Sequence, residues 1–313
     1  MTVVRPLRIL HVSDTHLLGD GKRHYDVVDT TAALRSVLDR ASSVADVDVV
    51  VLSGDLSDDG TPASYRALLE LVEPWAAERG AVVVPAMGNH DLRAGFEEVL
   101  GERERTVLVR GFRVVTVDTS VPGAGYGRLD DARLDRLRVA LAGGEDPDRA
   151  ERAADPGWAA FRPTVVVLHH PPVPARSALL AALELQDPGA FLEICAEAGV
   201  AAVLAGHYHH ALVASAQGVP VVVAPGVANS SDPLAPCGHE RAEVGSGFAV
   251  VDVPGVPGDD PADGPADGPA PGLSVVVVPV PHASDVADGT ELFDLPPDEV
   301  ERIAALAGPG ASS

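Results

Sequence analysis

The chain has little cysteine, few aromatic residues and no long apolar run. Among its 313 residues are two cysteines, Cys195 and Cys237, which argues against a framework of disulfide bonds. No apolar run reaches the roughly 18 residues that a membrane-spanning helix needs, and residues 1–10 lack the pattern of a secretory signal peptide. We therefore expect a soluble, cytoplasmic protein with no membrane span.

Positive charge is also scarce. The chain carries 23 Lys and Arg against 46 Asp and Glu, a net charge of −23. Binding to a nucleic acid polymer needs Lys and Arg to replace the counterions on phosphates, so this balance argues against such a partner. A substrate that carries phosphate would need cations at the site, which bound metal ions could supply. A small, singly charged diester would be repelled less than a polyanion.

Apolar residues make up 46% of the chain and recur in a pattern typical of α/β proteins. We predict helices at 30–45, 62–79, 94–100, 130–141, 179–185, 188–198 and 294–307. We predict strands at 7–12, 47–52, 81–87, 106–109, 113–118, 164–168, 200–204, 211–215, 219–224, 247–253 and 273–280. The first three strands alternate with helices, which indicates a largely parallel sheet. The architecture that fits is two packed sheets with helices outside, a four-layer αββα sandwich, in one domain spanning 1–313.

Two segments differ in composition from the rest of this predicted domain. Residues 254–272 contain a repeated Pro-Ala-Asp-Gly and lack apolar side chains to bury, so we predict a disordered insert without catalytic residues. Residues 143–163 are polar, and we predict a surface excursion there. The tail at 294–307 is expected to be a terminal helix.

Five of the predicted strands are followed at once by oxygen or imidazole side chains. Those strands are 7–12, 47–52, 81–87, 164–168 and 200–204, and the side chains are Asp14, His16, Asp55, Asn89, His169, His207 and His209. Open α/β sheets hold ligands outside the carboxyl ends of their strands, so these residues predict one shared site. Carboxylate, amide and imidazole groups suit Mn, Fe or Zn, whereas calcium and magnesium sites are nearly all oxygen. Seven candidate ligands are too many for one tetrahedral ion and suit two ions that share a carboxylate.

The spacing of these residues indicates which of them act together. Asp14 and His16 are two apart, so in extended backbone they project from the same side and can reach one ion. The same argument applies to His207 and His209. Asp55 is the carboxylate that directly follows its strand, which suits a bridge between two ions roughly 3.5 to 4 Å apart.

The ordered blocks resemble the calcineurin-like binuclear metallophosphoesterases, and among these the bacterial class III cyclic-nucleotide phosphodiesterases. The family blocks are D-x-H, G-D-x-x-D, G-N-H-D/E, a lone H and G-H-x-H, and all five occur here in order between residues 14 and 209. The resemblance implies the same αββα fold. It assigns one ion to Asp14, His16, Asp55 and His209, and the other to Asp55, Asn89, His169 and His207. The metals expected are Mn, Fe or Zn, with Fe and Mn favoured.

The resemblance also assigns roles around the metals. His90 matches the family's catalytic histidine, which contacts the substrate phosphate and can protonate the leaving oxygen. Asp58 is expected to orient a histidine or a metal-bound water. The nucleophile would be a hydroxide that bridges the two ions. Outside this set we expect structural or surface positions for the remaining histidines, His11, His24, His170, His210, His239 and His282.

The function that these expectations favour is hydrolysis of a small phosphodiester, a 3′,5′-cyclic nucleotide such as cyclic AMP, to the 5′-nucleotide. The alternatives are a phosphomonoesterase or nucleotide pyrophosphatase with the same metals, and a non-catalytic scaffold. The scaffold would be expected to have broken ligand blocks, and none is broken here. No aromatic-rich stretch marks a base-binding pocket, and Tyr208, Trp158 and Phe161 are the candidates for stacking. A homodimer is retained as one alternative for its assembly.

Overall fold

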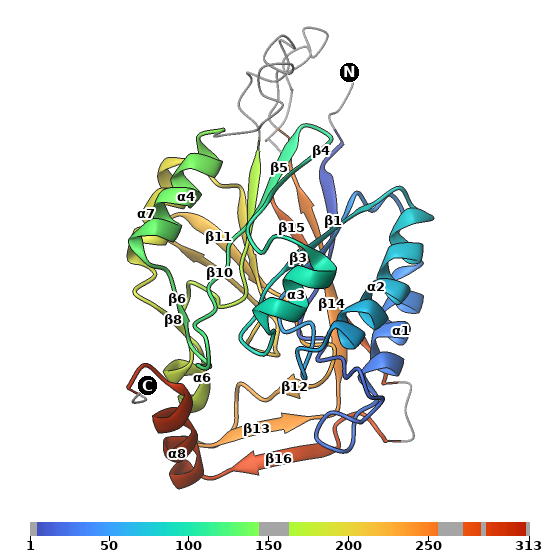
Figure 1. The fold of residues 1–313 in the computed structure, drawn as a ribbon, viewed down its shortest axis with the longest axis vertical. Coiled ribbons are helices and arrows are strands. Elements are labelled where there is room, and N and C mark those ends of the chain that lie inside the picture. The colour runs from blue at the N-terminus through green and yellow to red at the C-terminus, as the bar shows by residue number, and fades with distance from the viewer. Residues whose placement is uncertain (1–4, 144–162, 256–271, 283–285, 311–313) are drawn as a thin grey trace, which may run out of the picture.

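The computed structural model describes residues 5–143, 163–255, 272–282 and 286–310. Two large sheets pack face to face within it (Figure 1). The first has the order β15-β14-β1-β2-β3. Its strands are β1 (Leu7–Val12), β2 (Val49–Ser53), β3 (Val82–Ala86), β14 (Ser246–Val253) and β15 (Ser274–Val280). Strands β1, β2 and β3 are parallel, whereas β14 and β15 extend the sheet in antiparallel pairing.

The second large sheet has the order β10-β11-β9-β7-β5-β4. Its strands are β4 (Thr106–Val109), β5 (Phe112–Thr116), β7 (Thr164–Val167), β9 (Ala202–Ala205), β10 (Leu212–Ala216) and β11 (Val219–Val223). The four inner strands are parallel and the two edge strands antiparallel. The inner strands therefore all end at the same edge of the sheet.

Alternation of side chains along β1 separates two of the apolar cores. Leu7 and Ile9 join the core between the two sheets. Leu10 and Val12 point to the opposite face, as a period of two requires, and join the core beneath the helices. Because both faces are buried, apolar residues occupy four of the six positions of the strand, which explains why it was recognisable in the sequence.

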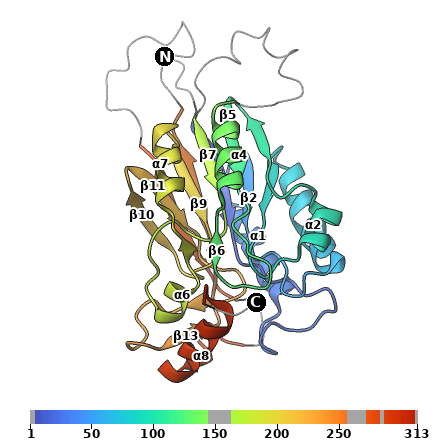
Figure 2. The ribbon, with the colours of Figure 1, turned by 60° about the vertical axis from the view of Figure 1, so that its left-hand side comes forward.

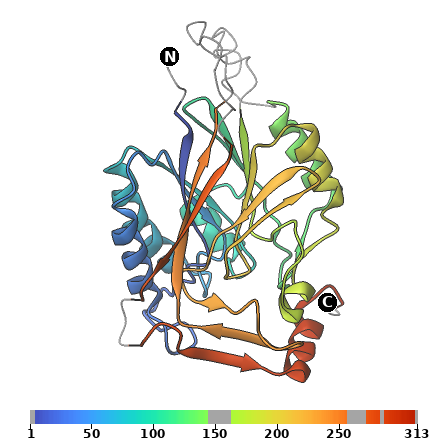
Figure 3. The ribbon, with the colours of Figure 1, turned by 180° about the vertical axis from the view of Figure 1, so that it is seen from behind.

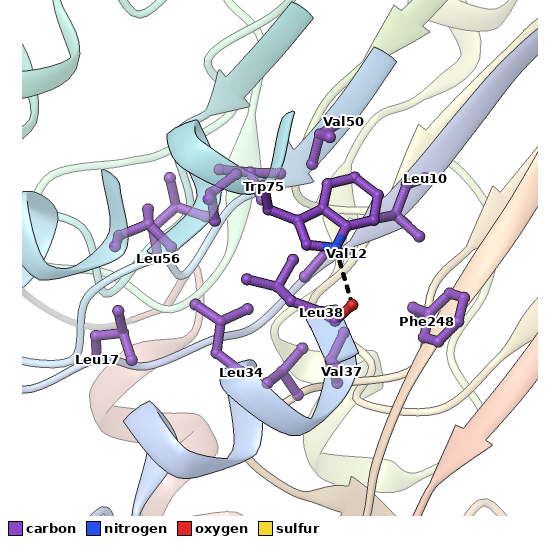
Figure 4. Packing of buried hydrophobic residues seen from close by; sticks show 14 of the residues in the cluster. Leu10, Val12, Leu17, Leu34, Val37, Leu38, Val50, Leu56, Trp75 and Phe248 are labelled. Atoms are coloured by element: carbon purple, nitrogen blue, oxygen red, sulfur yellow. Dashed lines mark hydrogen bonds between the residues drawn. The ribbon is translucent and has the colours of Figure 1, made fainter. Parts of the chain in front are cut away.

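Helices cover the outer face of each sheet. Helices α1 (Thr30–Ala41), α2 (Pro62–Ala77) and α3 (Arg93–Leu100) pack on the first sheet, and α4 (Asp131–Leu141), α6 (Ala178–Ala182) and α7 (Gly189–Glu197) pack on the second. Figure 1 shows α4 and α7 on the side opposite to α1 and α2, and Figure 2 shows α7 and α2 on opposite sides of the strands. In the first helical layer the Trp75 indole donates a hydrogen bond of 2.9 Å to the carbonyl of Leu38, which joins α2 to α1 (Figure 4). The predicted four-layer αββα sandwich is confirmed.

A third sheet lies at the end of the sandwich toward which β1 runs (Figures 1 and 3). It consists of β12 (Ser230–Ser231), β13 (Glu240–Glu243) and β16 (Glu291–Leu295), and the chain continues into α8 (Pro297–Ala307). We call these four elements the capping layer. None of its strands was predicted, because two to five residues of mixed polarity carry no clear period. The expected helix at 294–307 begins only at Pro297, and its first residues belong to β16.

Most other predicted boundaries agree with the structure to within a few residues. Helix α1 ends at Ala41 rather than at residue 45, and its N-cap is Asp29, whose carboxylate accepts a hydrogen bond from the backbone N–H of Ala32. Two short strands, β6 (Gly127–Arg128) and β8 (Leu185–Gln186), pair in stretches expected to be loop and helix. The excursion at 143–163 and the insert at 254–272 lie mostly outside the described residues. Within the described part of the chain, no helix has the length and apolar character needed to cross a bilayer.

Candidate metal centre

The ligand loops continue the pairing of their strands and then turn sharply. Past the end of β1, the backbone N–H of Asp14 donates to the carbonyl of Gly54 at 3.1 Å, and that of His16 donates to the carbonyl of Asp55 at 3.0 Å. These hydrogen bonds hold two of the predicted ligand blocks against each other. Side chains that lie 40 residues apart in the sequence are thereby brought to one edge.

Five of the predicted ligands have left-handed backbone conformations. Their φ angles are +52° for Asp14, +43° for His16, +49° for Asp55, +70° for His207 and +51° for His209. Such conformations cost roughly 1 to 3 kcal/mol each in non-glycine residues and occur mainly at functional sites. The extended backbone that the two-residue spacing predicted is therefore wrong, because the chain turns at each ligand to aim its side chain inward.

The glycines before two of the ligands make room for other ligands. A Cβ on Gly206 would lie 1.8 Å from Oγ of Ser13 and 2.8 Å from a carboxylate oxygen of Asp14. A Cβ on Gly88 would lie 2.2 Å from a carboxylate oxygen of Asp55. The glycines of the G-H and G-N blocks are thus required by close approach of neighbouring loops.

The first group of ligands comprises Asp14, His16 and His209, whose donor atoms lie within 4.8 Å of one another. Nδ1 of His16 donates to Asp58 at 3.0 Å, and Nδ1 of His209 donates to the carbonyl of Asn229 at 3.3 Å. These bonds assign the proton of each neutral imidazole to Nδ1. The two Nε2 atoms carry lone pairs, and they face each other at 3.3 Å.

The second group is built around Asp55. Nδ1 of His169 donates to the carbonyl of Ser53 at 2.9 Å, which leaves its Nε2 facing a carboxylate oxygen of Asp55 at 3.2 Å. The same oxygen lies 3.8 Å from Nε2 of His16, in the first group. Asp55 is therefore the carboxylate that both groups share.

His207 and Asn89 complete this second group. Nε2 of His207 donates to the carbonyl of Leu183 at 3.0 Å, so Nδ1 is the ring atom left to bind a cation. Within the described chain, Oδ1 of Asn89 is buried and has no hydrogen-bond partner. His207 clusters with His169, whereas His209 clusters with Asp14 and His16. The expectation that the two-residue spacing sends His207 and His209 to one ion is wrong.

These donors fit metal ions and do not fit one another. The facing Nε2 lone pairs of His16 and His209 repel each other, and the carboxylate of Asp55 beside Nε2 of His169 attracts positive charge. A buried acceptor such as Oδ1 of Asn89 costs roughly 1 to 3 kcal/mol when it has no donor. Cations between these atoms would give all of them an attractive partner, and imidazole nitrogen with carboxylate oxygen is the donor set that Mn, Fe and Zn take.

The pKa values of the two buried aspartates are shifted in opposite directions. Burial by itself would raise the pKa of Asp55, but the imidazoles of His169 and His90 outweigh it and hold that pKa well below its ordinary value. Burial, with Asp55 nearby, raises the pKa of Asp14. Asp55 therefore stays ionised and supplies the fixed negative charge at the middle of the site.

His90 lies at the open side of this group, and 46% of its side chain is exposed. Its Nδ1 is 3.2 Å from Asp58, and its backbone N–H donates to Asp55 at 2.8 Å. Burial of the ring would lower its pKa, but the carboxylates of Asp55 and Asp58 raise it to about 9. His90 is therefore held by its neighbours as a proton donor, with Nε2 as the atom left for an external partner.

Asp58 contacts three imidazoles, as its expected orienting role requires. Besides His16 and His90 it lies 3.4 Å from Nδ1 of His24. Burial alone would raise the pKa of Asp58, but the contacts with the three imidazoles lower it well below its ordinary value. We expected a structural or surface position for His24. It is buried, but it also contacts Asp58 and so belongs to the site. No motif in the sequence marks it.

Asp91 is a second residue whose role the sequence left open. Its carboxylate accepts hydrogen bonds from the backbone N–H groups of Leu56, Ser57 and Gly88 and from the Tyr65 hydroxyl, at 2.8 to 3.3 Å. It therefore ties the loop that carries Asp55 to the loop that carries Asn89. Its place in the G-N-H-D block was the available signal.

Two further expectations concern residues beside the ligands. Both ring nitrogens of His170 have protein partners, Thr119 at 2.8 Å and the carbonyl of Gly125 at 3.2 Å, as expected for a structural histidine. Tyr208 is fully buried and its hydroxyl donates to the carbonyl of Val173, so it cannot stack on a ligand. Trp158 and Phe161 lie outside the described residues.

Comparison with known proteins places the chain in a family. The family model described as calcineurin-like phosphoesterase matches residues 7–211, and the chain belongs to that family. A probable cyclic nucleotide phosphodiesterase of Rhodococcus erythropolis is 38% identical over 246 residues, 76% of each chain. A cAMP/cGMP dual specificity phosphodiesterase of Mycobacterium tuberculosis is 36% identical over 246 residues, 76% of this chain and 73% of that one.

A solved structure agrees on the fold. The anchor protein of the inner membrane complex of Plasmodium superposes with a TM-score of 0.54 and covers 97% of this chain and 95% of its own. Its sequence identity is 12%, so this likeness concerns the fold alone. The fold and the family assignment thus agree. The residues matched by the family model, 7–211, also contain every predicted ligand.

Proposed function

We propose that this protein is a metal-dependent phosphodiesterase that hydrolyses a 3′,5′-cyclic nucleotide to the 5′-nucleotide. The observation that carries the proposal is the convergence of two ligand groups on the shared carboxylate of Asp55, with His90 beside them. The names of the relatives in Rhodococcus and Mycobacterium support the choice of a cyclic nucleotide.

The ligands divide between two ions in this proposal. Asp14, His16, Asp55 and His209 would hold one ion, and Asp55, Asn89, His169 and His207 would hold the other. Bound cations supply positive charge that polarises the phosphodiester and lowers the pKa of the attacking water. Each imidazole ligand is oriented by the hydrogen bond that its other nitrogen makes, to Asp58, Ser53, Leu183 or Asn229.

His90 handles the proton of the leaving group. Attack of water on phosphorus breaks the bond to the 3′ oxygen of the ribose, and that oxygen must gain a proton. Nε2 of His90 would donate it, while Nδ1 stays on Asp58, 3.2 Å away. Cations bound at Asp55 would take up part of the attraction that raises the pKa of His90, and so make the proton easier to release.

The charge of the protein favours a diester over a monoester. A cyclic nucleotide carries one negative charge, whereas its product is a dianion that an acidic chain with a net charge of −23 repels more strongly. Arg93, the arginine that follows His90 in the sequence, is directed to Asp118 at 3.8 Å and to the carbonyl of Ser120 at 3.4 Å. The 5′-nucleotide should therefore accumulate.

A time course with the purified, metal-analysed protein tests this proposal. We expect cyclic AMP or cyclic GMP to be converted to the 5′-nucleotide, with inorganic phosphate appearing much more slowly. Phosphate released as fast as the nucleotide would contradict the diesterase assignment and favour a phosphomonoesterase. The same assay on Asp55→Ala protein, purified identically, controls for contaminating phosphatases.

A further inference from the structure

A short turn beside the metal centre presents an aromatic side chain to solvent. The backbone N–H of Val27 donates to the carbonyl of His24 at 3.1 Å and closes the turn. Its two central residues, Tyr25 and Asp26, have φ angles of +49° and +57°. Positive φ at both central positions is characteristic of type I′ turns, which favour Asn-Gly and disfavour bulky residues. A tyrosine in such a strained conformation points to a role for its side chain.

The ring of Tyr25 is connected to the metal centre through a series of neighbouring, tilted rings. Its centroid lies 4.2 Å from that of His24, which lies 4.7 Å from that of His16. The ring of His90 lies 4.7 Å from the ring of His16 on another side. The ring of His24 therefore lies between Tyr25 and His16, a predicted metal ligand.

The capping layer supports the same ring from behind. Phe293 of β16 meets Tyr25 edge to face, with centroids 5.3 Å apart, and the turn lies near the start of β16 (Figure 3). Despite these two contacts, 52% of Tyr25 is exposed. An aromatic ring fixed on two sides and open on another is a stacking surface without a partner.

We propose that Tyr25, braced by Phe293, is the surface on which the base of the nucleotide stacks, an inference that rests on the proposed function. With the phosphate at the metals and the base on Tyr25, the ribose spans the distance over His24. Aromatic stacking accepts any base, because every base has a π face. The site should therefore accept both cyclic AMP and cyclic GMP.

The neighbours of Tyr25 determine the charge of its phenol. Burial by neighbouring chain and the carboxylates of Asp58 and Glu240 raise the pKa of Tyr25 to about 12. The phenol therefore stays neutral and adds no negative charge near the phosphate. Stacking on a neutral ring also requires no Lys or Arg side chain, and this acidic chain has few of these residues.

Steady-state kinetics with two substrates test this inference. The pair is cyclic AMP and a ribose 3′,5′-cyclic phosphate without a base. For Tyr25→Ala we expect KM for cyclic AMP to rise roughly tenfold, the size of one lost stacking contact, with kcat changed by less than about threefold. Kinetics with the base-free diester should not change. Tyr25→Phe should behave as wild type, because it keeps the ring.

Matched variants separate stacking from a general loss of stability. Val139→Ala removes an apolar side chain of similar exposure, 51%, from α4 in the opposite helical layer, and should leave both substrates unaffected. Phe293→Ala should raise KM for cyclic AMP by a smaller factor. If Tyr25→Ala raises KM for both substrates by the same factor, or for neither, the stacking assignment is overturned.

Failure of the proposed function gives a different result. In that case the wild-type protein hydrolyses neither cyclic diester, and binding is measured instead by calorimetry with 5′-AMP and with ribose 5-phosphate. If wild type binds 5′-AMP more strongly than ribose 5-phosphate, and Tyr25→Ala removes this difference, the stacking role of Tyr25 is supported although the diesterase proposal fails. Equal binding of the two compounds by wild type would overturn the base surface itself.

Discussion

The edge that carries the ligands and the capping layer are built on different principles. At the edge, each ligand follows a strand whose carboxyl end is buried, and the loops between are joined by backbone hydrogen bonds and by Asp91. In the capping layer the strands have two to five residues. The edge is determined by the core of the protein, whereas the capping layer depends on contacts made at the surface.

The ion pairs of the capping layer illustrate the contrast. Arg241 meets Asp294 at 2.7 Å, and His239 meets the same carboxylate at 2.7 Å, all with partly exposed side chains. Pairs in contact with solvent contribute little to stability. The carboxylates at the edge are instead buried and would be neutralised by metal ions, so their removal should have much larger effects on metal binding and turnover.

The largest effect is expected for Asp55→Ala. Because Asp55 lies against ligands of both groups, its loss should reduce occupancy of both metal sites and bring turnover to the limit of detection. Elemental analysis and the phosphodiesterase assay measure the two effects. Asp232→Ala, which removes a carboxylate that follows β12 and pairs with Arg241 of the capping layer, should change neither. Loss of one metal equivalent with the other intact would mean that Asp55 does not bridge.

His90→Ala should affect chemistry without affecting metal content. Its imidazole is replaced, but the backbone N–H that donates to Asp55 remains. We expect turnover to fall by roughly 10² to 10⁴, the range for a positioned acid or base. A fall in bound metal that parallels the fall in turnover would identify His90 as a ligand instead.

Glu240→Gln should change the pH dependence of stability. Glu240 lies in β13, hydrogen-bonded to Ser177, and burial raises its pKa from 4.5 to about 6. The folded state therefore holds this proton more tightly than the unfolded state, so ionisation destabilises the fold as pH rises from about 4.5 through about 6. Glutamine cannot ionise, and its stability relative to wild type should rise over that interval by up to about 2 kcal/mol.

Denaturant unfolding at pH 4.5 and pH 7.5 measures this difference. Glu240→Gln should leave metal content unchanged, since Glu240 is not among the ligands. A stability difference between variant and wild type that stays constant with pH would show that Glu240 titrates as it does in the unfolded chain.

The smallest effect is expected from deleting residues 259–271. The segment has no apolar side chain that could anchor it beyond alanine and proline, and the cost of closing a loop changes only slowly with its length. Melting temperature and turnover should both stay within error of wild type. A marked fall in either would mean that this segment packs on the domain or reaches the site.

Wherever a buried strand precedes a ligand, the sequence by itself predicted the site. The run before Asp14 is apolar because both faces of β1 are covered, and parallel strands end at a common edge, so motif and geometry coincide. The elements of the αββα sandwich were predictable for the same reason. What periodicity does not encode is the backbone conformation at each ligand, where left-handed turns replaced the expected extended chain.

Only the tertiary structure shows that His24, Tyr25 and Phe293 lie together beside the ligands. His24 belongs to the site because folding places it on Asp58, and Phe293 meets Tyr25 across 268 residues of chain through a strand too short to be recognised. Contacts of this kind arise between surface segments whose composition is compatible with many arrangements. Local sequence determines strands and turns, whereas the packing of the whole chain determines which distant side chains become neighbours.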